Sequence, residues 1–290
     1  MSALIREWRD RRCGLPVRRM ARALAVGQAT VYRLPRRPSD ADLALRDAIQ
    51  TIATDWPNYG YRGITRELHR RGWSVNAKKV LRLMRSDNLL CLRKRSSAGP
   101  SYKPHGLATY PNRAAELTPN GIDQLWVADL TYVRLRWAWI FVAVIMDAFS
   151  RRCIGWALET HLGTELTLGA LRMALVRRRP MPGLVHHSDQ GVQYAAHEYV
   201  ALLREHGIEV SMSRAGKPND NAACERFIRT LKYDEVYLRD YADVGDARRS
   251  IGRFLDDIYN HKRLHSSIGW VPPAEFEAAL AERLLIAKPA

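Results

Sequence analysis

The sequence predicts an α/β protein in which a mixed-sheet domain follows a small, basic, all-helical region. Residues 59–89 show helical spacing around a tight turn, whereas three adjacent strand patterns and then alternating helices and strands follow residue 120. The net charge of +16 is uneven, because residues 1–115 hold 24 Lys and Arg against 8 Asp and Glu, and residues 116–290 hold 22 of each. A length of 290 residues allows about two domains at roughly 150 residues each.

Prolines and glycines mark the expected domain boundaries. Residues 96–119 hold four prolines and two glycines with little hydrophobic periodicity, which predicts a linker. A shorter proline-containing break separates a basic segment at 1–38, helix-turn-helix-like near 20–33, from a helix-turn-helix domain at 39–95. The mixed-sheet domain is expected at 120–278 and a short tail at 279–290.

The helix-turn-helix prediction depends on two short helices, 62–71 and 77–86. Gly72 can end the first and Asn76 can cap the second. The second helix has one apolar stripe and four basic residues away from it, as a helix entering the major groove needs: Lys78, Lys79, Arg82 and Arg85. An ordinary helical hairpin with a basic outer face remains the alternative. The concentrated positive charge favours nucleic acid as a partner, since bound phosphates release counterions.

The mixed sheet is expected to begin as an antiparallel meander. Strands at 125–133, 139–147 and 152–158 are separated by short turns. Alternating elements follow, namely a helix at 164–178, a strand at 184–187, a helix at 197–206, a strand at 208–211 and a helix at 220–237. Hairpin strands followed by α/β units imply a mixed sheet with helices on its faces.

Composition excludes several classes of protein. The longest apolar uncharged run, 137–146, is ten residues long, against about 20 for a membrane span. Charged residues near the N-terminus have no apolar segment behind them, so no secretory signal is expected. The cysteines are far apart and suit a reducing cytoplasm as small core residues: Cys13, Cys91, Cys153 and Cys224.

Three carboxylates occupy positions that suggest chemistry. Asp129 lies inside an apolar strand, where a charge costs several kcal/mol (about 2–7 for an unpaired polar group, more for an ion) unless something compensates it. Asp189 follows a short strand at the sheet edge where α/β proteins bind ligands. Glu225 lies on the last predicted helix, whose same side carries Asn221, Arg229 and Lys232.

Such a carboxylate set favours Mg²⁺ or Mn²⁺ over zinc. Two ions would suit an in-line attack on a phosphodiester, with Lys232 where substrate phosphates approach. The alternative is that each acid is an ordinary cap or ion-pair partner, and Asp147 and Glu159 are interpreted in that way. The pair His186 and His187 is expected to be structural or to orient substrate.

These residues resemble the DDE triad of transposases and retroviral integrases. Thirty-five residues separate Asp189 from Glu225, and Lys232 follows seven residues later, as in that superfamily. The segments 126–132, 188–194, 219–227 and 260–273 are similar to the OrfB transposases of bacterial insertion-sequence family three. The resemblance implies an RNase H-like catalytic domain, with Asp129, Asp189 and Glu225 as catalytic metal ligands. The residues expected to contact DNA are Asn221 and the basic side chains named above: Lys78, Lys79, Arg82, Arg85, Arg229 and Lys232. Trp270 stands where that family usually has tyrosine.

The resemblance also implies the reaction and its setting. We expect Mg²⁺-dependent strand cleavage and 3′-hydroxyl strand transfer at insertion-sequence ends, by a homo-oligomer on DNA in the bacterial cytoplasm and nucleoid. An upstream OrfA protein could act beside this chain or be fused to it. Two alternatives stay open: a DNA-binding regulator that keeps the fold without cutting, and a related nuclease that cuts without joining.

Overall fold

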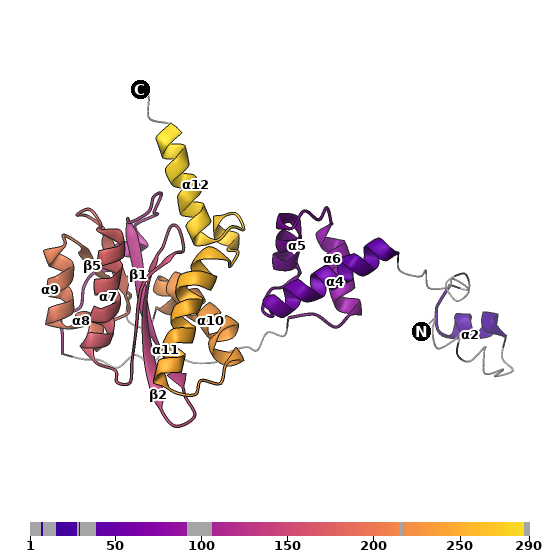
Figure 1. Ribbon diagram of the computed structural model, residues 1–290, viewed down its shortest axis with the longest axis horizontal. Coiled ribbons are helices and arrows are strands. Elements are labelled where there is room, and N and C mark those ends of the chain that lie inside the picture. The colour runs from indigo at the N-terminus through magenta and orange to yellow at the C-terminus, as the bar shows by residue number, and fades with distance from the viewer. Residues whose placement is uncertain are drawn as a thin grey trace. The chain divides into compact units, whose positions relative to one another are not determined.

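The computed structural model describes residues 16–27, 39–91, 106–214 and 217–286, together with the single positions 7 and 29 (Figure 1). The chain divides into two compact units, Met1–Gln50 and Thr51–Ala290. In the predicted basic segment 1–38, helix α2 spans Val17–Ala23. Positions 1–6, 8–15, 28 and 30–38 of that segment, which include the end of the predicted helix-turn-helix-like stretch, lie outside the described residues, as do positions 96–105 of the predicted linker. None of the described helices is long and apolar enough to cross a membrane.

The predicted pair of helices is present as α5, Tyr61–Arg70, and α6, Ala77–Ser86, which contact each other. Gly72 turns the chain between them with φ of +84°, a conformation that favours glycine. Asn76 caps α6, because its side chain accepts a hydrogen bond from the Lys78 N–H at 2.8 Å. The buried side of α6 is the predicted apolar stripe: Val80, Leu83 and Met84. Helix α4, Asp40–Asp55, precedes them and was not predicted.

The five-stranded sheet has the order β3-β2-β1-β4-β5. Its strands are β1 Leu125–Arg134, β2 Trp139–Asp147, β3 Cys153–Glu159, β4 Val185–Ser188 and β5 Glu209–Met212. Strands β1 to β3 form the predicted antiparallel meander, and β4 and β5 extend the sheet in parallel from β1. This is the RNase H-like mixed sheet that the resemblance implied.

Helices cover both faces of the sheet (Figure 1). One face packs against α7, Thr164–Arg178, and α9, His197–Glu205, with the short α8, Val192–Ala195, between them. The other face packs against α10, Ala222–Asp234, and α11, Val244–Arg253, which continues as a π-helical segment at Phe254–Tyr259. The chain then forms α12, Pro273–Ile286. Side chains alternate across β1, so that this central strand contributes to both cores.

Strand β3 and helix α7 approach each other closely at Gly155. A Cβ atom at this position would lie 2.2 Å from the Ala170 carbonyl oxygen, so only glycine allows this packing.

The last part of the predicted linker is attached to the sheet. A 3₁₀ turn at Arg113–Ala115 donates the backbone N–H groups of Arg113 and Ala114 to Ser211 Oγ on β5, at 3.0 and 3.2 Å. Asn112 donates its side-chain amide to Asp220 at 2.9 Å. These bonds satisfy the hydrogen-bonding groups of a stretch that lacks regular structure. Hydrophobic periodicity in the sequence does not reveal such bonds.

Candidate active site

Asp129 lies on β1, and Asp189 directly follows β4, the strand that runs parallel to β1 beside it. Val127 on β1 is in register with His187 on β4, and each aspartate lies two residues beyond its member of that pair. Carboxyl ends of parallel strands form the edge at which α/β sheets bind ligands. The sheet topology therefore brings together two acids that are far apart in sequence.

Asp129 is half-buried, and its environment disfavours the charged form. Its Oδ1 accepts a hydrogen bond from the Leu130 N–H at 2.8 Å. The pKa of Asp129 is raised to about 7, chiefly by burial and also by the negative charges of Asp189 and Glu225, while the Leu130 bond and the Lys232 charge oppose the shift. The other two carboxylates of the proposed triad thus both act electrostatically on this one.

Helix α10 is attached to β1 beside Asp129. The Asn221 side chain donates to the Ala128 carbonyl at 2.9 Å, and Cys224 Sγ lies 3.8 Å from the Val127 carbonyl oxygen. These contacts fix the first turn of α10, so Glu225 is exposed at the same sheet edge. The expected DNA contact of Asn221 does not fit this placement, because its side chain is buried and its amide nitrogen is used by β1.

Lys232 lies over Tyr132 of β1, with Nζ 4.8 Å from the ring centroid. Burial lowers the pKa of Lys232, and the nearby Asp129 charge opposes that shift. The two acids that follow it at the end of α10 pair elsewhere, Asp234 with Arg263 at 2.6 Å and Glu235 with Arg239 at 3.7 Å. Lys232 therefore lies near Asp129 and the exposed ring of Tyr132.

The remaining candidate DNA contacts are accessible to different degrees. Arg229 is exposed on α10, with Cζ 5.5 Å from the centroid of the Tyr233 ring. On α6, Lys78, Arg82 and Arg85 are exposed and Lys79 is half-buried. The helix thus presents a basic side opposite its buried apolar stripe, as its pattern predicted.

The described residues contain no ready-made group of three His, Cys, Asp or Glu side chains that could hold a metal ion. Their chemistry nevertheless fits a hard divalent cation, because all three candidate ligands are carboxylates. Asp129 supplies a second argument, since a cation would compensate the charge that its surroundings disfavour.

The acids and histidines interpreted as structural have structural partners. Asp147 is fully buried and accepts hydrogen bonds from backbone N–H groups of Asp123 and Ser150, both at 2.7 Å. Glu159 pairs with Arg248 at 3.5 Å. The buried pair of histidines bonds to hydroxyl groups, and burial lowers their pKa values to about 3 for His186 and about 4 for His187.

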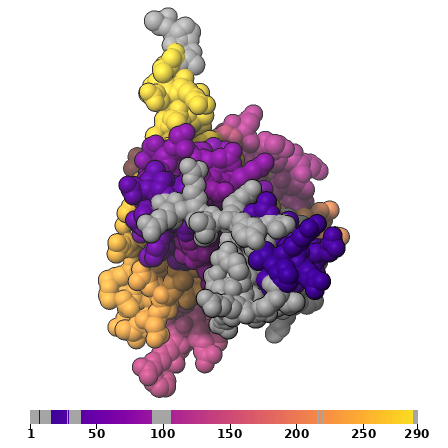
Figure 2. Space-filling model, turned by 90° about the vertical axis from the view of Figure 1, so that its right-hand side faces the viewer, coloured from indigo at the N-terminus to yellow at the C-terminus, as the bar shows by residue number. Residues whose placement is uncertain are grey.

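Sequence reasoning missed the aromatic residues of the β1–β2 hairpin, which projects beyond the helices that flank the sheet (Figures 1 and 2). Tyr132 and Trp139 meet edge to face, with ring centroids 5.4 Å apart, and both are exposed. Trp137 at the turn is 87% exposed, and Arg136 lies over its ring. Exposed aromatic residues beside arginines in a short turn were the available signal.

A central acidic sheet edge with an N-terminal helix-turn-helix defines the integrase-core class of DNA-processing enzymes. Models of the family described as "Integrase core domain" match residues 119–218 and 206–273, and a model described as "HTH-like domain" matches residues 40–97. The chain belongs to the OrfB-type transposases of bacterial insertion-sequence family three, within the DDE superfamily.

Three relatives illustrate this membership. The "Transposase for insertion sequence element IS904" of Lactococcus lactis is 33% identical over 256 residues, 83% of this chain and 98% of that protein. "Transposase InsF for insertion sequence IS3A" of Escherichia coli is 33% identical over 220 residues, 76% of each chain. The "Insertion element IS600 uncharacterized 31 kDa protein" of Shigella sonnei is 35% identical over 242 residues, covering 83% and 89%.

Solved integrase structures are more distant. The catalytic core of BIV integrase aligns with 56% of this chain and 99% of its own at 21% identity, with a TM-score of 0.42. The HTLV-2 integrase core in complex with magnesium aligns with 50% of this chain and 91% of its own at 15% identity, with a TM-score of 0.39.

Proposed function

We propose that Asp129, Asp189 and Glu225 are the catalytic carboxylates of this transposase and that together they bind two Mg²⁺ or Mn²⁺ ions. The observation that carries the proposal is that Asp129 on β1 and Asp189 directly after β4 each lie two residues beyond the paired Val127 and His187, with α10 attached beside Asp129. The effect of the Asp189 and Glu225 charges on the pKa of Asp129 supports it.

The reaction that this site would perform has two steps. In the first, a water oxygen attacks a phosphodiester at an end of the element, and the bond to the 3′ oxygen breaks to leave a free 3′-hydroxyl. In the second, that hydroxyl oxygen attacks a phosphodiester of target DNA, and one new bond replaces the one that breaks. Divalent ions held by the carboxylates would supply an activated nucleophile and stabilise the leaving oxygen.

The chain's own residues would hold the DNA for these steps. Lys232 and Arg229 extend from Glu225 along α10, where phosphates next to the cut would lie. Lys78, Lys79, Arg82 and Arg85 would contact the element's end through α6 in the major groove. We retain the predicted division into a basic segment, a helix-turn-helix domain, a linker, a catalytic domain and a tail.

The partners and location of the protein are also proposals. We infer that it acts as a homo-oligomer, since joining two ends to one target requires paired sites. An OrfA protein, separate or fused, would add recognition of the ends. Because its proposed substrate is insertion-sequence DNA, we infer that the protein acts in the bacterial cytoplasm with the nucleoid.

Replacing Glu225 by glutamine tests the proposal. A neutral amide cannot balance the metal charge, so cleavage and joining of terminal DNA should be lost while DNA binding stays nearly unchanged. Glu159→Gln is the matched control, because that glutamate pairs with Arg248 on the surface. Nicking and strand-transfer assays with Mg²⁺ provide the measurement.

The result also separates the alternatives. Mg²⁺-dependent cutting by the Glu225→Gln protein would contradict the assigned site. Cutting without joining by the unmodified protein would identify a nuclease, and binding without either reaction would identify a regulator.

A further inference from the structure

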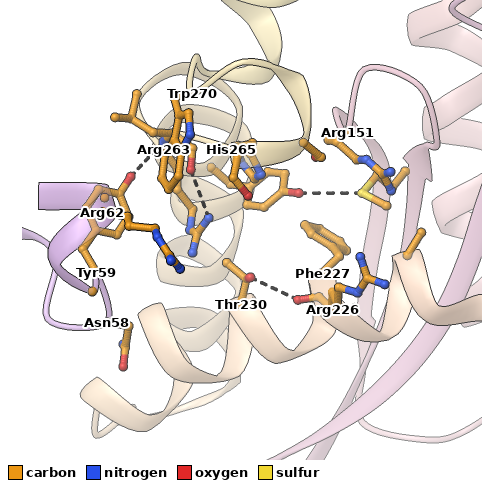
Figure 3. A pocket seen from close by; sticks show the side chains of 18 of the residues that line it. Asn58, Tyr59, Arg62, Arg151, Arg226, Phe227, Thr230, Arg263, His265 and Trp270 are labelled. Carbon is orange, nitrogen blue, oxygen red and sulfur yellow. Dashed lines mark hydrogen bonds between the residues drawn. The ribbon is translucent and has the colours of Figure 1, made fainter. Parts of the chain in front are cut away.

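A basic pocket of about 550 Å³ adjoins α10 (Figure 3), and Glu225 is not among its lining residues. Arg226 and Thr230 of α10 line it, and at about 100° per residue they lie roughly 100° and 140° around the helix from Glu225. The start of α5, the turn after β2 and the loop after the π-helical segment complete the lining. The pocket thus joins four segments that are far apart in sequence.

The pocket carries positive charge that the described residues do not balance. Four arginines line it, and none of the lining residues is an aspartate or glutamate: Arg62, Arg151, Arg226 and Arg263. Arg263 pairs with Asp234 at 2.6 Å. The other three form no ion pair with any described residue. A polyanion is the complementary ligand.

Arg151 is a half-buried pocket residue whose guanidinium group lacks a hydrogen-bond partner at one nitrogen, Nε, among the described residues. Burial lowers the pKa of Arg151 and the charge of Arg226 adds to that shift, while Tyr259 and the buried carboxylate of Asp147 oppose it. Desolvating a cation costs free energy, and no described carboxylate lies within ion-pair distance of Arg151, so an anion in the pocket would stabilise it.

The backbone at the start of α5 adds hydrogen-bond donors to the same pocket. The helix begins after Gly60, which supplies no side-chain cap, and its first turn contains no acidic residue. The first N–H groups of a helix have no acceptor within the helix, and its N-terminus favours negative charge. Arg62 of this first turn also lines the pocket, so side-chain and backbone donors converge.

We propose that this pocket binds a backbone phosphate of the DNA strand that reaches the catalytic carboxylates. Arg62, Arg151 and Arg226 would balance the phosphate charge, and the first turn of α5 would donate hydrogen bonds to its oxygens. We assign the phosphate to DNA because Arg226 is the residue next to Glu225 on α10. In this respect the inference rests on the proposed function.

The same pocket gives a role to part of the 260–273 segment, which the catalytic site does not use. His265 lines the pocket, and its Nε2 lacks a hydrogen-bond partner among the described residues. Ser266 and Ser267 add hydroxyl groups. Trp270 supplies a flat apolar surface on which a sugar or base next to the phosphate can pack.

Methylphosphonate scanning of the DNA tests the proposal in the full chain. The probe is a duplex with the terminal sequence that flanks the coding frame, with one neutral methylphosphonate at each position in turn. Binding is measured by anisotropy in EDTA across a salt series, for the unmodified protein and for Arg151→Met and Arg226→Met. Arg249→Met is the control, since Arg249 is exposed on α11 outside the pocket.

We expect both pocket variants to bind at least tenfold more weakly. The slope of the logarithm of the binding constant against the logarithm of salt concentration should be shallower by about 0.9 for each phosphate that the variant no longer neutralises. One methylphosphonate position should weaken the unmodified protein equally and weaken Arg151→Met no further. The melting temperature of Arg151→Met should not fall, because an unbalanced cation has been removed.

Three outcomes would overturn the inference. Unchanged DNA affinity with a lowered melting temperature would make Arg151 structural. Additive losses at every methylphosphonate position would place the contact elsewhere on the DNA. Stabilisation of the unmodified protein by millimolar inorganic phosphate, with no position-specific DNA effect, would indicate a free-anion site. Because binding is measured without metal, failure here leaves the Glu225→Gln result independent.

Discussion

Replacing Asp129 by asparagine should stabilise the protein at high pH when divalent ions are absent. The pKa of Asp129 is raised to about 7 by burial and by the charges of Asp189 and Glu225. In the unfolded chain an aspartate ionises near pH 4 (about 3.9). Between these values the folded state binds more protons than the unfolded state, so the free energy of unfolding falls as pH rises.

The size of the effect follows from the difference between the two pKa values. A difference of about 3 units corresponds to roughly 4 kcal/mol at 1.36 kcal/mol per unit. Solvent screening of a half-buried carboxylate reduces this to about 2 kcal/mol. The penalty is absent below about pH 4 and complete above about pH 7, and asparagine carries no charge that could create it.

Urea denaturation in EDTA at pH 4.5 and pH 8 measures this difference. The free energy of unfolding of Asp129→Asn, relative to the unmodified protein, should rise by most of 2 kcal/mol between the two pH values. Asp240→Asn is the control, because Asp240 is exposed in the segment after α10. Parallel pH profiles for the unmodified and Asp129→Asn proteins would refute the reasoning.

Two further predictions concern DNA contacts. Lys232→Ala should bind terminal DNA more weakly and cut it more slowly with an unchanged melting temperature, because Lys232 contacts the exposed Tyr132 ring and forms no ion pair with Asp234 or Glu235, which pair with Arg263 and Arg239. A variant that is fully active in binding and nicking assays would show that Lys232 is only part of a solvated helix face. Replacing Lys78, Arg82 and Arg85 together by alanine should reduce DNA affinity and its salt dependence far more than replacing Arg9, Arg11 and Arg12, because the first three occupy the exposed side of α6. Equal losses of affinity in a titration would mean that the basic charge binds DNA without a specific recognition helix.

The sequence predicted those helices and strands that show their own hydrophobic spacing, caps or turns. The strand 139–147 and the helices 77–86 and 164–178 have the predicted bounds, and other elements differ at their ends by one or a few residues. Helix α4 was missed although Leu45, Ile49 and Ile52 follow helical spacing and are buried. The 3₁₀ turn at Arg113–Ala115 could not be predicted, because its stability comes from Ser211, almost a hundred residues later.

The candidate site divides in the same way. Residue types and spacing selected Asp129, Asp189 and Glu225, while the register of β1 and β4 explains why two of them each lie two residues beyond a paired position. Helical spacing placed Asn221 beside Glu225 but could not show that β1 uses its amide. The basic pocket was not predictable, because it combines residues from four separate segments and depends on which arginines lack a carboxylate partner.

Helix α10 links the proposed catalytic site to the proposed phosphate pocket. The bond from Asn221 to Ala128 fixes the rotation of the helix about its axis beside Asp129. Glu225 and Arg226 are consecutive, so this one constraint sets both the side that carries the catalytic carboxylate and the side that lines the pocket. A helix is rigid over so short a span, and a phosphate held by Arg226 therefore has a fixed position relative to Glu225. The pocket would hold one phosphate of the strand on a different side of α10 from the metal ligands. This second contact would help to position the scissile bond, in addition to contacts at the reacting phosphate itself.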